Sequence, residues 1–163
     1  MKFRLTLFLT FLLLFNTKIF SQPGWANVQH PNTSQTIQEG GSLTVYAQVW
    51  INNVTNTGSP GAGVSAWIGY NSTNNDPEDN DGDWTWVAAS FNVDSGNNDE
   101  YQATISPHPA GTYYYASKFT HNGTTKYGGT GGFWNNDSVE LTVNQWATNQ
   151  EIGRASCRER VST

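Results

Sequence analysis

The sequence predicts an all-β fold, an antiparallel β-sandwich of about seven to eight strands, and three observations lead to it. Apolar residues alternate with a period of two along several short segments, which is typical of half-buried strands. Gly, Asn, Pro and Asp separate these segments at close intervals. No run of Glu, Lys, Leu and Ala offers the period of a long helix, and only 13% of the residues are charged, against about 25% in an ordinary globular chain.

Residues 42–51 form the most regular of the predicted strands. The odd-numbered residues, from Leu43 to Ile51, are all aliphatic and share one face, whereas the even-numbered ones, which include Tyr46 and Trp50, share the other. Two Gly residues precede the segment and two Asn residues follow it, and both pairs interrupt regular structure. We therefore expect the odd-numbered face to lie in the core.

The other segments with strand character follow at close spacing. Five further strands are expected at residues 63–70, 83–92, 100–106, 112–120 and 138–143, and short edge strands at 25–29 and 124–127. No internal repeat is visible, so residues 23–146 are expected to form a single β-sandwich domain. A chain of about 120 residues can bury an adequate core.

A Pro-Ala-Gly turn at residues 109–111 leads into the expected strand 112–120, which starts with Thr and three consecutive Tyr residues. In immunoglobulin-like domains, a Tyr near the start of a late strand anchors such a corner by donating its hydroxyl hydrogen bond to upstream backbone. Either Tyr113 or Tyr115 can fill this role. The expected fold is therefore an immunoglobulin-like antiparallel β-sandwich.

Residues 1–22 have the parts of a secretory signal peptide. Lys2 and Arg4 form a basic start, and an apolar segment of about 11 residues follows, which is too short for a membrane span of about 20 residues. The alternative is a buried N-terminal helix. We expect export, so that the mature protein is extracellular or lies at the cell surface without a membrane anchor.

Residues 147–163 differ in composition from the domain before them. The segment 151–161 is rich in Arg, contains Cys157, and matches the translation of a common short-read sequencing adapter along its whole length. The alternative is a natural basic tail. We interpret residues 147–163 as a non-native tail and expect that the natural protein continues past Asn144.

The charge of the domain excludes several classes of partner. Between residues 23 and 146, two Lys residues stand against eleven Asp and Glu residues, which leaves a net charge of −9. Nucleic acid and anionic membranes are therefore poor partners. Cys157 is the only cysteine, so no disulfide can stabilise the domain. The expected partner of the domain, taken as a monomer, is a polysaccharide or a downstream domain of the same chain.

The sequence offers no catalytic constellation within the domain. None of its three His residues lies in a nucleophile motif, and neither G-x-S-x-G nor H-E-x-x-H occurs. A glycoside hydrolase needs a pair of carboxyl groups, one with a raised pKa, and the acids here cluster in Gly- and Asn-rich loops that favour solvated, ionised groups. We expect the module not to be an enzyme.

The acidic segment 76–83 raises the question of a metal site. Asp79, Asp81 and Asp83 have the spacing of the first calcium ligands in a helix-loop-helix motif, but Trp84 then occupies the position of the required Gly and Ser90 that of the bidentate Glu. A looser calcium site is one reading, and an acidic hairpin without metal is the favoured one. No other cofactor is expected.

Aromatic residues give the best functional signal. Several lie on the strand faces opposite the aliphatic ones, and a sandwich buries only one face of each sheet. Exposed rings flanked by polar groups suit a sugar, because the ring packs on pyranose C–H groups. The alternative is packing against loops or a neighbouring domain. The candidate ligand contacts are Trp50, Trp67, Trp84, Trp86 and Trp134, with Lys118 and Asp83 as polar partners.

Three segments, residues 65–70, 91–101 and 111–119, and more weakly 127–134, resemble an immunoglobulin-like module of secreted bacterial proteins, especially those of Bacteroidetes. This module occurs beside amylase- or pullulanase-like and other extracellular enzymes. The resemblance implies a non-catalytic accessory role and assigns no ligand. The family usually has Arg where this chain has Lys118, which keeps the charge but loses a planar donor fork.

We therefore expect a non-catalytic accessory module of a secreted protein that binds polysaccharide, with an α-glucan favoured, through surface aromatics. The first alternative is a spacer or docking domain whose aromatics pack on a catalytic domain downstream. The second alternative is a stand-alone glycoside hydrolase.

Overall fold

The computed structural model describes residues 21–146, and this part of the chain is built from strands and one short 3₁₀ turn, η1 (Asp81–Asp83). No helix in the described part is long and apolar enough to cross a membrane. The strands are β1 (Pro23–His30), β2 (Gln35–Gln38), β3 (Leu43–Ile51), β4 (Ser65–Asn71), β5 (Thr85–Ser95), β6 (Asn98–Ile105), β7 (Gly111–His121), β8 (Thr124–Gly128) and β9 (Val139–Asn144).

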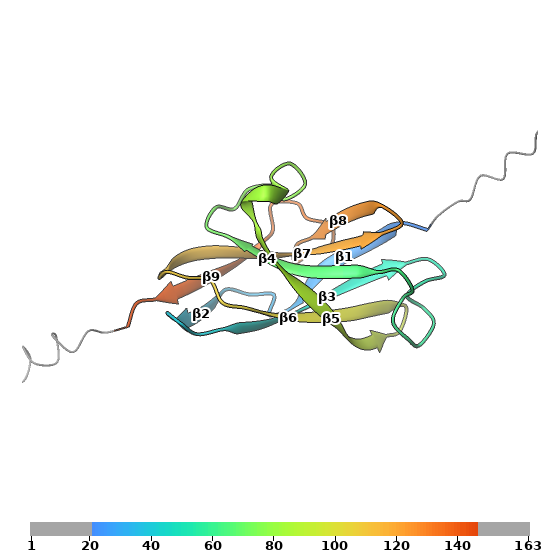
Figure 1. Ribbon diagram of the computed structural model, residues 1–163, viewed down its shortest axis with the longest axis horizontal. Helices are drawn as coiled ribbons and strands as arrows, with labels where there is room; N and C mark the ends of the chain where they lie inside the picture. Colours follow the sequence, from blue (N-terminus) through green and yellow to red (C-terminus); the bar gives the residue numbers. More distant parts are fainter. Residues whose placement is uncertain (1–20, 147–163) are drawn as a thin grey trace, which may run out of the picture.

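The strands form two layers that share one strand (Figure 1). The first layer has the order β1-β3-β6-β5, and the second has the order β5-β4-β7-β9-β2, with β8 also paired to β7. The first half of β5 pairs with β4, and from Ser90 onward it pairs with β6. The result is a curled sheet whose two halves face each other, which confirms the all-β, sandwich-like fold.

The expectation of a purely antiparallel sheet is wrong at one edge. β2 pairs with β9 in parallel, from Gln35 opposite Leu141 to Gln38 opposite Asn144. The chain reaches this edge by crossing from β1 in the first layer to the second layer, so that β2 runs in the same direction as β9. The four residues of β2 are mostly polar, and only Ile37 packs on the core, which is why alternation did not reveal this strand.

The core between the layers is mainly aliphatic. As expected, β3 buries Val45, Ala47, Val49 and Ile51, while Tyr46 and Trp50 on the other face are only half-buried. The larger rings of the core are Tyr101, Tyr115 and Phe119. None of the seven tryptophans, all of which lie within the described residues, belongs to this core.

Both tyrosines considered for the corner make hydrogen bonds to upstream backbone. The Tyr113 hydroxyl donates to the carbonyl of Pro109, four residues upstream, at 2.7 Å. The buried Tyr115 hydroxyl donates to the carbonyl of Pro31 at 2.8 Å. Tyr113 therefore anchors the corner that precedes β7, and Tyr115 ties β7 to the crossing between β1 and β2.

β1 joins the two layers along their open side. It pairs with β3, and its Val28 amide also donates to the carbonyl of Gly129, just after β8, at 2.7 Å. The Ser117 hydroxyl of β7 donates to the carbonyl of Asn27 at 3.0 Å. The predicted signal peptide, apart from its last two residues, and the predicted tail lie outside the described residues.

Candidate aromatic surface

The outer face of the second layer collects aromatic side chains around one lysine. Strand register places Trp67 of β4 opposite Lys118 of β7, and Lys118 opposite Tyr127 of β8. Two residues after Trp67 on β4, Gly69 lies opposite Trp86 of β5. Side chains at directly paired positions project to the same face, so these residues form a continuous aromatic surface.

Trp86 lies flat on the sheet because β4 has no side chain beneath it. A Cβ atom at Gly69 would overlap the six-membered ring of Trp86. Trp84 stacks on Trp86 with ring centroids 5.6 Å apart and an interplanar angle of 20°, and Tyr127 packs at 5.7 Å. Trp84 is only 5% exposed, and Trp86 is half-buried. These rings form a second apolar cluster outside the sandwich core.

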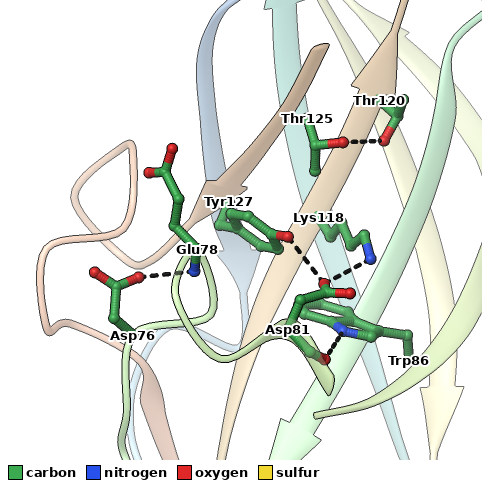
Figure 2. A network of polar contacts seen from close by, with 8 residues as sticks. All are labelled: Asp76, Glu78, Asp81, Trp86, Lys118, Thr120, Thr125 and Tyr127. Atoms are coloured by element: carbon green, nitrogen blue, oxygen red, sulfur yellow. Dashed lines mark hydrogen bonds and ion pairs between the residues drawn. The ribbon is translucent and has the colours of Figure 1, made fainter. Parts of the chain in front are cut away.

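The loop between β4 and β5, residues 72–84, covers this cluster, and Asp81 attaches it (Figure 2). Lys118 Nζ lies 2.6 Å from Asp81 Oδ1, and the Tyr127 hydroxyl donates to the same oxygen at 2.9 Å. The Trp86 indole N–H donates to the backbone carbonyl of Asp81 at 3.1 Å. The loop is thus fixed to three strands of the second layer, β5, β7 and β8.

The ammonium group of Lys118 lies over three aromatic rings at the centre of the surface. Its ammonium group lies 5.0 Å from the Trp86 ring centre, 5.6 Å from that of Trp67 and 5.9 Å from that of Tyr127. A cation this close to ring faces is attracted by their negative quadrupoles. Its exposed side-chain fraction is 17%, so water screens its contact with Asp81 only in part.

The ionisation of the groups in this network follows from their contacts. Partial burial alone would raise the pKa of Asp81, but the hydrogen bonds from Lys118 and Tyr127 outweigh it, and the net pKa is lowered. Burial raises the pKa of Tyr127, and its hydrogen bond to the Asp81 carboxylate raises it further. The tyrosine is therefore neutral and the carboxylate ionised at neutral pH.

A chain of amide contacts holds the start of β5. The Trp84 indole donates to the side-chain oxygen of Asn75 at 3.1 Å, and the Asn75 amide donates to Asp83 Oδ2 at 3.0 Å. Asn71 at the end of β4 donates to the same Asn75 oxygen at 2.8 Å. Asp83 therefore makes a contact within the loop, whereas Asp81 is the acid beside Lys118.

A smaller aromatic corner follows β8. The exposed fraction of Phe133 is 40%, and the half-buried Trp134 donates its indole hydrogen bond to Ser138 at 2.7 Å. Both line a hollow of about 60 Å³ together with Tyr127, Lys126 and the loop acids Asp76 and Glu78. Because Tyr127 also belongs to the Lys118 cluster, this corner continues the aromatic surface.

The structure brings together most of the ligand contacts that the sequence suggested. Trp67, Trp84, Trp86 and Lys118 lie in one cluster, and Trp134 adjoins it through Tyr127. Trp50 does not join them: it lies on β3 in the first layer, and its ring covers the backbone of Gly24 in β1.

The three acids suggested as calcium ligands are not brought together. Within residues 21–146, no group of three or more His, Cys, Asp or Glu side chains is placed to hold a metal ion. Asp81 is occupied by Lys118 and Tyr127, Asp83 accepts from Asn75, and Asp79 is exposed. A calcium ion needs six to eight oxygen ligands. The carboxylates of Asp81 and Asp83 instead hold the loop in place.

Sequence reasoning missed three residues of the surface. The sequence predicts Tyr127 only as part of an edge strand and Gly69 only as part of a strand, and it gives Phe133 no role. Gly69 carried a usable signal, because a glycine inside a strand often marks the close approach of another group. Tyr127 gave none, because its partner Asp81 is 46 residues away in the sequence. Phe133 contacts Lys126, which is close in the sequence, but no alternation or motif marks this pair.

The described residues show no catalytic arrangement. His108 is exposed and lies 3.2 Å from Glu39. His121 is buried, and its Nδ1 is hydrogen-bonded to the backbone carbonyl of Ser21 at 2.8 Å. Both imidazoles are thus held by contacts that fix the fold rather than by a nucleophile.

No protein family model matches the sequence, but curated proteins do. The chain is 33% identical to an amylopullulanase of Thermoanaerobacter thermohydrosulfuricus over 113 residues, which is 61% of the chain and 8% of that protein. Amylopullulanases of Thermoanaerobacterium thermosulfurigenes and Thermoanaerobacterium saccharolyticum match at 31% and 32% identity, over 48% and 37% of the chain.

The chain therefore spans less than a tenth of the length of the relatives it matches, 8%, 5% and 6% respectively. The expected similarity to modules found in amylase- and pullulanase-like proteins is confirmed at this level. The link to Bacteroidetes and the adapter origin of residues 147–163 stay predictions.

Proposed function

We propose that residues 23–146 form a non-catalytic accessory module that binds an α-glucan for a secreted enzyme chain. The observation that carries the proposal is the aromatic surface around Lys118, on a domain similar to small parts of enzymes named for amylose and pullulan. We assign binding rather than chemistry to the module, because the chain matches only small parts of these enzymes.

Two parts of the aromatic surface remain open to a ligand. Trp67 is half-buried at one end of the row, and Phe133 and Trp134 lie at the other. Trp84 and Trp86 differ, because Trp84 is 5% exposed and Trp86 packs against Gly69, Trp84 and Tyr127. We assign Trp67, Phe133 and Trp134 to ligand contact, and Trp84 and Trp86 to the support of the loop.

The chemistry of the surface suits a neutral sugar chain. Ring faces pack on pyranose C–H groups, and polar groups beside them exchange hydrogen bonds with the hydroxyls. Lys118, the Thr120–Thr125 hydroxyl pair at 3.0 Å, and the carboxylates of Asp76 and Glu78 lie along the row (Figure 2). The net charge of −9 in the domain disfavours an anionic glycan.

Affinity electrophoresis tests the proposal. The domain of residues 23–146 should be retarded in native gels that contain amylopectin or pullulan, and Trp67→Ala should reduce the retardation at least tenfold. Trp50→Ala is the matched control, because Trp50 is also half-buried but lies on the other layer. Unchanged mobility of the wild-type domain in every glucan, with a native circular dichroism spectrum, would refute the proposal.

A spacer or docking domain is the second candidate, and two observations favour it. The loop 72–84 already covers Trp84 and Trp86, which leaves fewer open rings for a sugar. Residues 21 and 146 also leave the domain at opposite ends of its long axis, as expected for a module within a longer chain (Figure 1). This function predicts no retardation by any glucan but a higher melting temperature for a neighbouring domain when the two are fused.

A further inference from the structure

A hollow of about 500 Å³ lies at one end of the sandwich, separate from the aromatic surface. It is open to solvent and is bordered by the end of β4, the start of β5, and the turn that leads into β7. Its volume lies within the range of about 300–1,000 Å³ that small-molecule sites occupy. Loops at the ends of a sandwich are where immunoglobulin-like domains place their binding residues.

Two tyrosine rings lie in the apolar part of the hollow, beside Pro109 and Ala110. Tyr70 and Tyr113 pack edge to face, with centroids 6.0 Å apart and an interplanar angle of 79°. The hydroxyl of Tyr113 is fixed by its hydrogen bond to Pro109, and both rings are half-buried against the core. These rings are therefore held in place and need no rearrangement to receive a ligand.

The polar part of the hollow is rich in neutral groups and has one carboxylate available. Ser72, Thr85 and Thr112 contribute hydroxyls. Asp83 uses Oδ2 to accept from Asn75, and within residues 21–146 its second oxygen accepts no hydrogen bond. His108 also lines the hollow, but no Lys or Arg does, which disfavours phosphate and other anions. The apolar lining, which consists of the two rings with Pro109 and Ala110, is too small for a lipid chain.

We propose that this hollow is a second glucan-binding site, in which Tyr70 and Tyr113 pack against a sugar ring and Asp83 accepts hydrogen bonds from its hydroxyls. The inference rests on the proposed function and extends it, because a module with two separated sites can hold two segments of one polysaccharide. Two linked sites bind such a chain more tightly than either site alone.

The test follows backbone amide resonances of the ¹⁵N-labelled domain during titration with maltohexaose. Two groups of signals should shift, one around Trp67 and Lys118, and one in residues 108–113. Asp83→Asn should lower the affinity measured from the signals of residues 108–113 at least tenfold and leave the affinity measured from the signals around Trp67 unchanged. Trp67→Ala should do the reverse. Asp79→Asn is the control, since Asp79 is an exposed acid of the same loop that does not line the hollow.

The outcomes separate the two proposals. Shifts confined to Trp67 and its neighbours would refute the second site and support the proposed function. Shifts confined to residues 108–113 would support the second site and refute the aromatic surface as the contact. Shifts in neither group would refute both. A second variant, Thr112→Trp, adds a large side chain to the lining of the hollow and keeps Asp83, and it should remove the second set of shifts even if Asp83→Asn alters the loop.

Discussion

Asp81 fixes the 72–84 loop to the second layer through both its side chain and its backbone. Its Oδ1 atom accepts from Lys118 and Tyr127, and its backbone carbonyl accepts from Trp86. Hydrogen bonds to an ionised acceptor are stronger than neutral ones, so this carboxylate is a strong attachment of the loop, beside the contacts of Asn75 with Asn71 and Trp84. The covered state of Trp84 therefore depends on a side chain that is itself partly exposed.

Asp99 is the opposite electrostatic case, a carboxyl that the fold makes costly to ionise. It is fully buried, its Oδ2 atom accepts from the Gly61 amide at 2.7 Å, and its Oδ1 atom has no partner among the described residues. Burial raises the pKa of Asp99 above its ordinary value of 3.8, and the nearby charge of Asp94 adds to this, while the Gly61 hydrogen bond acts against it.

This shift predicts how the stability of an Asp99→Asn variant should differ from wild type as pH changes. Because the pKa of Asp99 is higher in the folded than in the unfolded protein, its protonated form favours folding. The stability that this form contributes is complete below pH 3.8 and is lost as the pH rises through the folded pKa. Asn does not titrate. The free energy of unfolding of Asp99→Asn minus that of wild type should therefore increase as the pH rises above 3.8.

Urea unfolding of both proteins between pH 3 and pH 7 measures this difference. Taking the difference between variant and wild type removes the titration of Asp81, which is shared and has the opposite sign, because a lowered pKa contributes stability that is lost as the pH falls. A difference that stays constant across this range, or that moves in favour of wild type as the pH rises, would show that Asp99 is ionised without cost.

On the scale of elements, the contact between β4 and β5 depends on Gly69, because the Trp86 ring occupies the space that a side chain at this position would take. Gly69→Ala should push Trp86 off the sheet and destabilise the domain by about 1–3 kcal/mol, the usual cost of overpacking. In a Trp86→Ala background the same change should cost little, because the space above β4 is then empty. The measurement is the coupling energy of this double-mutant cycle from urea unfolding, expected to exceed about 1 kcal/mol.

The control for this cycle is Gly82→Ala. Gly82 lies in the η1 turn of the covering loop, and a Cβ atom there would meet nothing within 4 Å. This change should leave the free energy of unfolding within about 0.5 kcal/mol of wild type. Additive effects of Gly69→Ala and Trp86→Ala would mean that the indole does not rest on β4.

The strands that alternation predicts are those with one buried face. The odd-numbered side chains of β3 reach the core as expected, because period two reports burial directly. β2 has one core residue, Ile37, and gave no such pattern. The sequence predicts a strand at 83–92, whereas β5 begins at Thr85, ends at Ser95 and pairs in both layers, and no local pattern encodes which strands it pairs with.

The site was predictable to a similar extent. Alternation places Trp67 on an outer face, and the structure pairs it with Lys118 across β4 and β7. The acids of the loop were grouped by their closeness in sequence, whereas Asp81 finds its partner Lys118 37 residues further along the chain. Sequence patterns therefore indicated which faces carry the rings, but the partners of the rings depend on long-range pairing.

For the whole molecule, β1 determines whether the curled sheet closes. Ala26 and Val28 are fully buried in the core that both layers share. The Val28 amide bonds to Gly129 in the second layer while the rest of β1 pairs with β3 in the first. β1 can approach β8 closely because Gly128 has no side chain. A Cβ atom there would lie 2.5 Å from the Ser117 hydroxyl oxygen and 2.7 Å from the backbone nitrogen of Asn27.

A domain that starts at Pro31 should therefore fail to fold cooperatively, although it keeps every other strand and the Pro31 carbonyl that accepts from Tyr115. Without β1, the apolar side chains of β3 and β7 at this seam face water, and the backbone groups of β3 lose their partners. Thermal unfolding followed by near-ultraviolet circular dichroism should show one sharp transition for residues 22–146 and none for residues 31–146. Addition of a peptide of residues 22–30 should restore the transition, because it supplies the same strand; a sharp transition at unchanged temperature without the peptide would mean that the two layers are held together by β5 alone.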